Sequence, residues 1–250
     1  MIRRALSDMR VPPVIQVLSL DAMGTLIKPR EPIARVYAEA ARRYGIEGAN
    51  ESGIAAAFPG QFRRLGKESP CFGAGNEGGL AWWRKLIVGA LEDAGASPSS
   101  MTPPVTEALA QHLFDHYANS DAWTLIDDGA PAALARIRLK GIVLCVVSNF
   151  DSRLKGILAG LGLDRHFQMV VLSGELGIEK PDGRIFEAVL RQFRLETNPQ
   201  ALLHIGDDVE RDYRTARAIG ARALLFDPKG KHDEIPKEDR LVSFSRLALY

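Results

Sequence analysis

Apolar residues gather in five short runs that have the length and the β-branched composition of strands buried on both faces. These runs cover residues 14–20, 142–147, 168–172, 201–205 and 222–226. Helical spacing of apolar positions separates or follows the last four runs, at residues 130–140, 152–161, 183–193 and 209–219. Strand–helix alternation of this kind predicts an α/β fold, a parallel sheet with helices on both faces, in which ligands bind at the carboxyl ends of the strands.

The segment between the first two runs departs from this alternation. It has no strand-like run, and apolar residues recur there with helical spacing at residues 33–44, 52–65, 80–94 and 105–118. Residues 66–79 (GKESPCFGAGNEGG) predict a glycine-rich loop between two of these helices.

Two domains are therefore expected. Residues 12–28 and 120–250 are predicted to form the α/β core, and residues 29–119 an all-helical cap domain above the carboxyl edge of the sheet. The charged stretch after Asp227 (KGKHDEIPKEDR) predicts a solvated loop.

Four polar motifs follow the predicted strands, and the first is Asp21-Ala-Met-Gly-Thr25. An aspartate at the tip of a buried strand is well placed for nucleophilic attack, because the sheet holds it still while the loop leaves it accessible. Gly24 permits a tight backbone turn beside it. Taken alone, the motif is also typical of a turn aspartate that accepts hydrogen bonds from nearby amides.

The second and third motifs offer groups that bind anions. Ser148 and Asn149 precede a predicted helix, where a hydroxyl and backbone N–H groups can bind phosphate, although Ser148 or Asp151 could instead cap that helix. Lys180, followed by Pro181, can bind phosphate as a point charge or offset the repulsion between clustered carboxylates. A lone Lys-Pro pair is more often a solvated loop.

The fourth motif, Gly206-Asp207-Asp208-Val-Glu-Arg-Asp212, places carboxylates at the end of another strand. Facing Asp21 across the sheet, Asp207 would complete a hard oxygen site of the kind that suits Mg²⁺. An acidic run is also favoured at a helix N-terminus by the helix dipole, which is an alternative role for Asp208 and Glu210.

Composition restricts the partners and the compartment. The formal net charge of +1 gives no electrostatic footprint for nucleic acid or an acidic membrane surface, and no run approaches the ~18 apolar residues of a membrane span. The two cysteines, Cys71 and Cys145, have neither metal-site nor disulfide-framework spacing. A cytoplasmic protein with a small-molecule partner is expected; the sequence predicts no oligomeric state.

The order of the motifs, DxxGT, then SN, then KP, then GDxxxxD, resembles the haloacid dehalogenase superfamily of hydrolases, in particular members with a helical cap between the first two core strands. The stretches WWRKLIV and SNFDSRLKGILAGLGL are similar to a subgroup represented by the haloacid dehalogenase-like hydrolase domain-containing protein 3 family. The resemblance implies a Rossmann-like core and a Mg²⁺-dependent hydrolase of small phosphorylated molecules.

It also implies a role for each motif residue. Asp21 would be the nucleophile that forms an aspartyl-phosphate, Thr25 would support its loop, and Ser148, Asn149 and Lys180 would hold the transferring group. The metal site would consist of Asp21, the backbone carbonyl of Met23, and Asp207. Asp212 would act on this site indirectly, through Lys180 or a water.

Met23 departs from the superfamily's phosphatase pattern, which has a second aspartate at this position as general acid. A general acid contributes roughly 10²–10⁴ in rate, or about 3–5 kcal/mol of barrier. Three hypotheses remain: a phosphatase-like hydrolase whose substrate has a good leaving group, a protein of reduced activity that binds a phosphorylated ligand or a protein partner, and a 2-haloacid dehalogenase, whose halide leaves without a proton. The motif D-A-M-G-T-L is similar to that of the dehalogenases, but they lack the Gly206-Asp207 pair.

Overall fold

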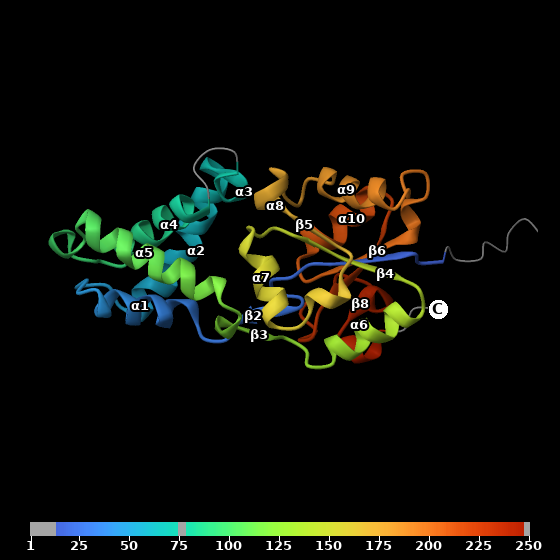
Figure 1. Ribbon diagram of the computed structural model, residues 1–250, viewed down its shortest axis with the longest axis horizontal. Helices are drawn as coiled ribbons and strands as arrows, with labels where there is room; N and C mark the ends of the chain where they lie inside the picture. The colour runs from blue at the N-terminus through green and yellow to red at the C-terminus, as the bar shows by residue number, and fades with distance from the viewer. Residues whose placement is uncertain (1–13, 75–78, 248–250) are drawn as a thin grey trace, which may run out of the picture.

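In the computed structural model, which describes residues 14–74 and 79–247, a six-stranded parallel sheet runs in the order β5-β4-β1-β6-β7-β8 (Figure 1). Its strands are β1 (Val17–Leu20), β4 (Val143–Ser148), β5 (Met169–Leu172), β6 (Leu202–Gly206), β7 (Arg222–Phe226) and β8 (Arg240–Leu241). Leu20 lies opposite Val146 on one side and Ile205 on the other. The residues that follow these three positions therefore meet at one edge of the sheet. The predicted α/β class is confirmed.

Helices cover both faces of this sheet. The helices of the core are α6 (Ala130–Leu139), α7 (Arg153–Gly160), α8 (Ser173–Leu176), α9 (Arg184–Gln192) and α10 (Thr215–Ala218). Alternate residues of a strand point to opposite faces, so Leu18 and Leu144 pack in one cluster with α6 and α7, while Val17 and Cys145 pack in a second with α9 and α10. Burial on both faces explains the continuous apolar runs of the central strands.

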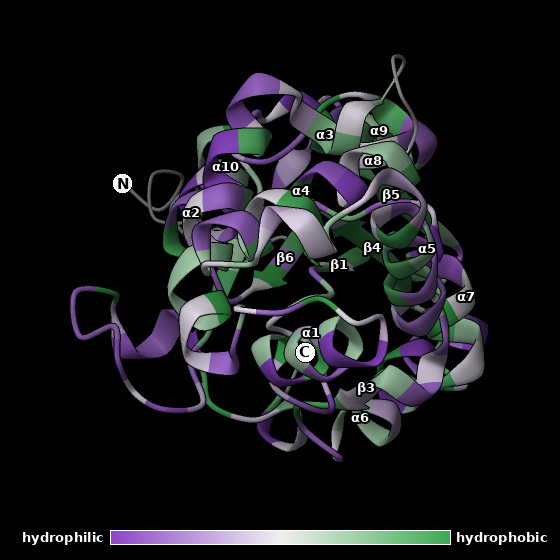
Figure 2. Ribbon diagram, turned by 90° about the vertical axis from the view of Figure 1, so that its left-hand side faces the viewer, coloured by the Kyte–Doolittle hydropathy of each residue, from purple (hydrophilic) through white to green (hydrophobic). Residues whose placement is uncertain are grey.

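Between the first two strands of the sheet in sequence, the described residues form four long helices and one short one. They are α1 (Ile33–Arg43), α2 (Glu51–Glu68), α3 (Pro70–Gly73), α4 (Gly79–Asp93) and α5 (Pro103–Ala118), and we call residues 33–118 the helical insertion. An antiparallel pair of short strands, β2 (Ile27–Pro29) and β3 (Trp123–Leu125), carries the chain out to it and back. In Figure 1 the helical insertion lies at the left of the sheet, and Figure 2 looks onto it from that side with the apolar strands β1, β4 and β6 behind.

Two predicted boundaries around α2 are wrong. Asn50 caps the helix by accepting a hydrogen bond from the Gly53 N–H at 2.9 Å, and the helix continues past residue 65 to Glu68. It continues because Leu65 is buried against α4 side chains and because Arg64 pairs with Glu68 one turn later. The predicted glycine-rich loop of residues 66–79 therefore starts later than expected, after the short helix α3, and its residues 75–78 lie outside the described part of the chain.

One predicted strand and one predicted helix of the core also differ from expectation. Strand β1 begins at Val17 instead of residue 14, and Val14 is 66% exposed. The predicted helix of residues 209–219 is divided into π-helical turns at Val209–Arg214 and the α-helix α10. Among the described residues, none of the helices combines the length and apolar character needed to cross a membrane.

The charged stretch after Asp227 is not simply a solvated loop, so this prediction is wrong in part. Ile235 is buried within it, and Arg240 begins β8, which extends the sheet beside β7. Phe244 then packs on Phe226 with ring centroids 5.1 Å apart, and the Asp127 carboxylate accepts a hydrogen bond from its N–H at 2.6 Å. Ile235 stands alone among charged and proline residues, and the apolar stretch from Leu241 to Phe244 is short and interrupted by Ser243. A search for apolar runs therefore misses both.

Phe244→Ala should therefore lower the free energy of unfolding by about 3–5 kcal/mol, because Phe244 is fully buried and a cavity would replace its ring. The matched control is Val242→Ala, two residues earlier, where the side chain is 41% exposed and the change should stay within about 0.5 kcal/mol. Urea unfolding measures both. Equal, small losses in the two variants would show that the C-terminal segment is not part of the core.

Candidate active site

Lys180 lies at the centre of a buried charge cluster at the carboxyl ends of β1, β4 and β6. Its Nζ donates hydrogen bonds to Asp21 Oδ1 at 2.8 Å, to Asp212 Oδ1 at 2.6 Å and to the Val147 carbonyl at 2.9 Å. These three acceptors match the three donors of an ammonium group. The Lys180 side chain is 2% exposed, and those of Asp21 and Asp212 are 8% and 3% exposed. The cluster is therefore almost fully removed from water.

Asn149 holds the Lys180 backbone in place. Its side-chain Nδ2 donates to the Lys180 carbonyl and its Oδ1 accepts from the Lys180 N–H, both at 2.8 Å. This pair of hydrogen bonds joins the loop after β4 to the loop that follows α8. A contact between Asn149 and substrate stays a prediction, because its amide already serves this purpose in the structure.

Asp212 is oriented by several partners at once. The π-helical turns that contain it are capped by Asp208, whose Oδ1 accepts from the N–H groups of Glu210 and Arg211. Asp212 Oδ2 accepts from the Asp208 N–H at 3.0 Å, and Oδ1 lies 3.1 Å from His204 Nε2. Both Asp212 oxygens therefore already have hydrogen-bond partners within the protein. This favours an indirect role for Asp212, through Lys180, over direct metal ligation.

Burial and the shared ammonium group shift the pKa values in this cluster in opposite directions. Burial raises the pKa of Asp21, an effect that the Lys180 charge opposes without cancelling. Burial would also raise the pKa of Asp212, but the charge of Lys180 and the hydrogen bond from His204 lower it below its ordinary value. Burial lowers the pKa of Lys180, yet the two carboxylates outweigh this and raise it. A charged lysine is the result.

The Asp207 carboxyl group has no cationic partner among the described residues. Its pKa is raised to about 7, first by burial and then by the charges of Asp21 and Asp212, while the Thr25 hydroxyl donates to its Oδ1 at 3.3 Å. One carboxylate oxygen from each of these three aspartates lies within 4.8 Å of the others. Clustered carboxylates without a cation repel one another, and oxygen ligands of this type suit Mg²⁺. The donor set therefore fits a divalent cation.

Two glycines leave room for the carboxylates of the cluster. Gly24 has a φ of +94°, and a Cβ there would lie 2.3 Å from Asp207 Oδ2. A Cβ on Gly206 would lie 2.1 Å from the Asp212 Cγ. Any larger residue at either position would displace a carboxylate of the cluster. Met23, next to Gly24, has 39% of its surface exposed.

Ser148 has an unsatisfied hydroxyl group. It ends β4, directly after Val147, whose carbonyl binds Lys180. Its Oγ is buried and has no hydrogen-bond partner in the described structure. Because a buried polar group without a partner is costly, such a hydroxyl is typical of a site that a ligand completes.

The comparisons with known proteins agree with this geometry. The profile of the haloacid dehalogenase-like hydrolases matches residues 15–220. The chain belongs to this family. It is therefore a hydrolase built on the Rossmann-like sheet described above, and both phosphatases and dehalogenases are among its relatives.

Three relatives illustrate the range of the family. The haloacid dehalogenase-like hydrolase domain-containing protein 3 of Bos taurus is 35% identical over 93% of this chain and 92% of its own. The phosphoserine phosphatase of Thermus thermophilus is 34% identical over 59% of this chain and 55% of its own. Among solved structures, the 2-haloacid dehalogenase of Pseudomonas syringae is 25% identical, covers 93% of this chain and 96% of its own, and has a TM-score of 0.62.

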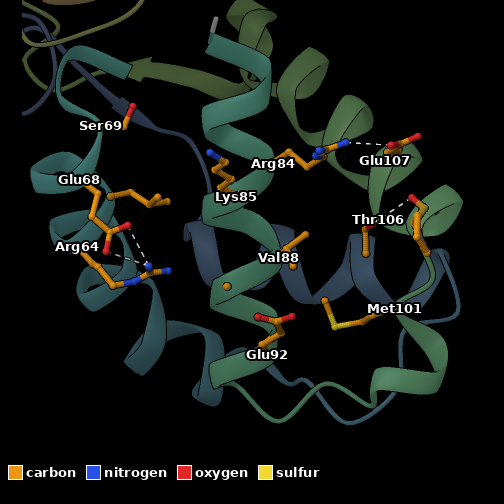
Figure 3. Close-up of a pocket in the computed structure, with 13 residues that line it drawn as sticks. Arg64, Glu68, Ser69, Arg84, Lys85, Val88, Glu92, Met101, Thr106 and Glu107 are labelled. Carbon is orange, nitrogen blue, oxygen red and sulfur yellow. Dashed lines mark hydrogen bonds and ion pairs between the residues drawn. The ribbon is translucent and has the colours of Figure 1, made fainter. Parts of the chain in front are cut away.

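A cavity of this hydrolase lies apart from the charge cluster. It is a surface groove of about 810 Å³ between α2, α4 and α5, and Figure 3 shows the side chains around it. Its charged groups include the ion pairs Arg64–Glu68 and Arg84–Glu107. None of the motif residues at the strand ends lines it, so the chemistry of the family is not placed there.

The sequence interpretation missed one part of the cluster. His204 lies within the apolar run of β6 and is fully buried; its Nδ1 lies 2.8 Å from the Ser19 hydroxyl of β1. Burial lowers its pKa, so it is neutral beside Asp212. The available signal was a single polar residue in each of two neighbouring buried strands, at positions that the register brings face to face.

Lys180→Met should lower the free energy of unfolding by about 3–5 kcal/mol, because it leaves two buried carboxylates without their cation. Adding Asp21→Asn should recover part of this loss. The control is Arg184→Met, which removes an exposed ion pair with Asp182 and should leave the free energy of unfolding nearly unchanged. Chemical denaturation measures all three. An equal response to Lys180→Met and Arg184→Met would contradict the buried cluster.

Proposed function

We propose that this hydrolase removes the phosphoryl group from a small phosphorylated molecule through Asp21. An Asp21 carboxylate oxygen attacks phosphorus, and the bond between phosphorus and the leaving oxygen breaks. Water then attacks the phosphorus of the aspartyl-phosphate, which releases phosphate and restores the carboxylate. The observation that carries this proposal is the buried, unpartnered Ser148 hydroxyl beside the Lys180–Asp21 ion pair at the ends of neighbouring strands.

The surrounding residues have separate tasks in this reaction. Lys180 binds the transferring group and holds Asp21 in place, and Asp212 and Asn149 hold Lys180 from its side chain and its backbone. Ser148 donates its hydroxyl to a phosphoryl oxygen, which gives that group the partner it lacks. Thr25 supports the loop of Asp21 by binding Asp207.

Mg²⁺ is the proposed cofactor, with Asp21, Asp207 and the Met23 carbonyl as its ligands. Bound there, it would offset the repulsion between the carboxylates and the phosphoryl oxygens. The support is the cluster of three carboxylates and the raised pKa of Asp207. Asp212 contributes to the same cluster but is held by Lys180 and His204.

The helical insertion is proposed to act as a cap domain, with residues 12–28 and 120–250 as the core and residues 29–119 as the cap. Both strands of the β2–β3 pair lie at the boundary, which is the place for a hinge. A cap that closes over the strand ends excludes water and selects the substrate. The two free, buried cysteines support the cytoplasmic location that the sequence predicts.

A 2-haloacid dehalogenase is the second candidate, because Met23 favours it. In that reaction Asp21 attacks the carbon that carries the halogen, and halide leaves without needing a proton. Asp207 is evidence against this candidate. It adds an acidic group beside the nucleophile, and a reaction without a metal does not need such a group. We therefore rank the phosphatase-type reaction first.

Mg²⁺ should stabilise the protein through Asp207. At a concentration 100 times its dissociation constant, a ligand adds about 2.7 kcal/mol to the free energy of unfolding, and Asp207→Asn should abolish the resulting rise in Tm. The matched control is Asp208→Asn, since asparagine caps the following helical turns equally well and its Mg²⁺ response should persist. Thermal shift with and without Mg²⁺ measures this. Identical responses in the two variants would refute the metal site.

Because the Met23 side chain cannot donate a proton, the rate of hydrolysis should depend on the leaving group of the substrate. Aryl and acyl phosphates, whose leaving groups need little protonation, should be cleaved, while sugar phosphates should react slowly. Met23→Asp should then raise turnover of alkyl phosphates by ~10-fold or more, which is less than a tuned general acid contributes. Steady-state kinetics on both substrate classes measures the effect.

Asp21→Asn is the control for this series, because it removes the nucleophile and keeps the shape. Phosphatase activity that survives in Asp21→Asn would refute the covalent mechanism. Consumption of a haloacid without Mg²⁺, with no gain from Met23→Asp, would support the dehalogenase. No turnover of any of these substrates by the wild type would support a binding protein of reduced activity.

A further inference from the structure

The loop that carries Ser148 and Asn149 is bound to the helical insertion by the next charged residue, Asp151. Trp83 of α4 donates its indole N–H to Asp151 Oδ2 at 2.7 Å, across 68 positions of sequence. Asp151 also accepts from the Arg153 N–H at the start of α7, as the sequence suggested for a helix cap. One carboxylate therefore fixes a helix start in the core and an aromatic side chain in the insertion.

Arg153 reinforces this contact from the core side. Its guanidinium group binds Asp151 with Nη2 to Oδ2 at 2.7 Å, and its Cζ lies 4.7 Å from the Trp83 ring centroid and 4.1 Å from that of Phe114. The Arg153 and Asp151 side chains are only 8% and 7% exposed. A charge-assisted hydrogen bond and cation–π contacts are strongest when they are shielded from water in this way.

A second contact joins the insertion to the other loop of the site. The Cys71 N–H in α3 donates to Glu179 Oε2 at 3.2 Å, and Glu179 directly precedes Lys180. Because Asn149 binds the Lys180 backbone, the two contacts converge on one rigid unit. The position of the helical insertion and the position of the site loops are thus mechanically linked.

We propose that Trp83, Asp151 and Arg153 form a latch that holds the helical insertion docked over the strand ends and so positions the Ser148 loop. Trp83 is the positioning residue of this latch, and it acts through Asp151. The docking itself stands on the contacts above, whereas its effect on turnover rests on the proposed phosphatase-type function. When the latch is weakened, the insertion undocks more often, and the fraction of protein ready to bind substrate falls.

Two adjacent tryptophans supply the test and its control. Trp83→Phe keeps an aromatic ring for Arg153 but removes the N–H that reaches Asp151. Trp82→Phe removes an equivalent N–H, which donates to the Ser69 carbonyl at 2.8 Å within the insertion itself. Both variants lose one indole donor from α4, and only the first loses a contact with the core.

The first readout is amide hydrogen exchange of Cys71, followed by NMR. This amide is bound to Glu179 across the same boundary, so it exchanges when the insertion undocks. Trp83→Phe should speed its exchange by about tenfold or more, because a hydrogen bond to a charged group is lost, while Trp82→Phe should leave it close to wild type. This readout needs no substrate, so it tests whether the latch holds the insertion docked even if the wild type hydrolyses no phosphate ester.

The second readout is the split between KM and kcat on an aryl phosphate. Substrate that binds the docked state restores it at saturation, so Trp83→Phe should raise KM with kcat nearly unchanged. Asp151→Asn, which keeps an acceptor for Trp83 but loses the charge that Arg153 binds, should give the same direction of change in both readouts and serves if Trp83→Phe folds poorly. Equal Cys71 exchange in Trp83→Phe and Trp82→Phe, or a fall in kcat alone, would overturn the proposal.

Discussion

The buried ammonium group of Lys180, held between Asp21 and Asp212, is the constraint on which the site depends. Taking ions out of water costs several kcal/mol each, and the cost is offset only when every donor and acceptor finds a partner. Here the Val147 carbonyl accepts the third hydrogen bond of the Lys180 ammonium group. His204 and the Asp208 N–H are the further hydrogen-bond partners of the Asp212 carboxylate. The parallel sheet makes this possible because it brings three strand ends to one edge, where a single lysine reaches them all.

The same cluster explains why the remaining parts have their particular chemistry. Burial, and after it the charges of Asp21 and Asp212, raise the pKa of Asp207. One lysine offsets only part of the charge of three aspartates, which is why the cluster fits a divalent cation. Gly24 and Gly206 are required because any Cβ would occupy the space of a carboxylate. The Ser148 hydroxyl is buried at the end of β4 and has no hydrogen-bond partner among the described residues. A phosphoryl group would supply an acceptor at this point.

Much of this arrangement could be predicted from the sequence, because strand ends in a parallel sheet converge and each motif residue follows an apolar run. Other features have no local signal. Strands β2 and β3 have three residues each, too few to form a pattern, and β8 has two. The pairing of Ser19 with His204 depends on strand register, and the Trp83–Asp151 contact joins residues 68 positions apart. Helical spacing predicted α4, but it could not indicate which of its two tryptophans contacts the α/β core.

The proposed mechanism depends most directly on which atom accepts the phosphoryl group. The decisive measurement is mass spectrometry of the peptides obtained after rapid acid quench of the protein with an aryl phosphate and Mg²⁺. The account predicts a phosphoryl group on the peptide that contains Asp21, at the Asp21 side chain, during turnover and its absence in Asp21→Asn. Hydrolysis of the aryl phosphate with no phosphoryl group on Asp21 at any quench time, or with the group on another residue, would contradict it.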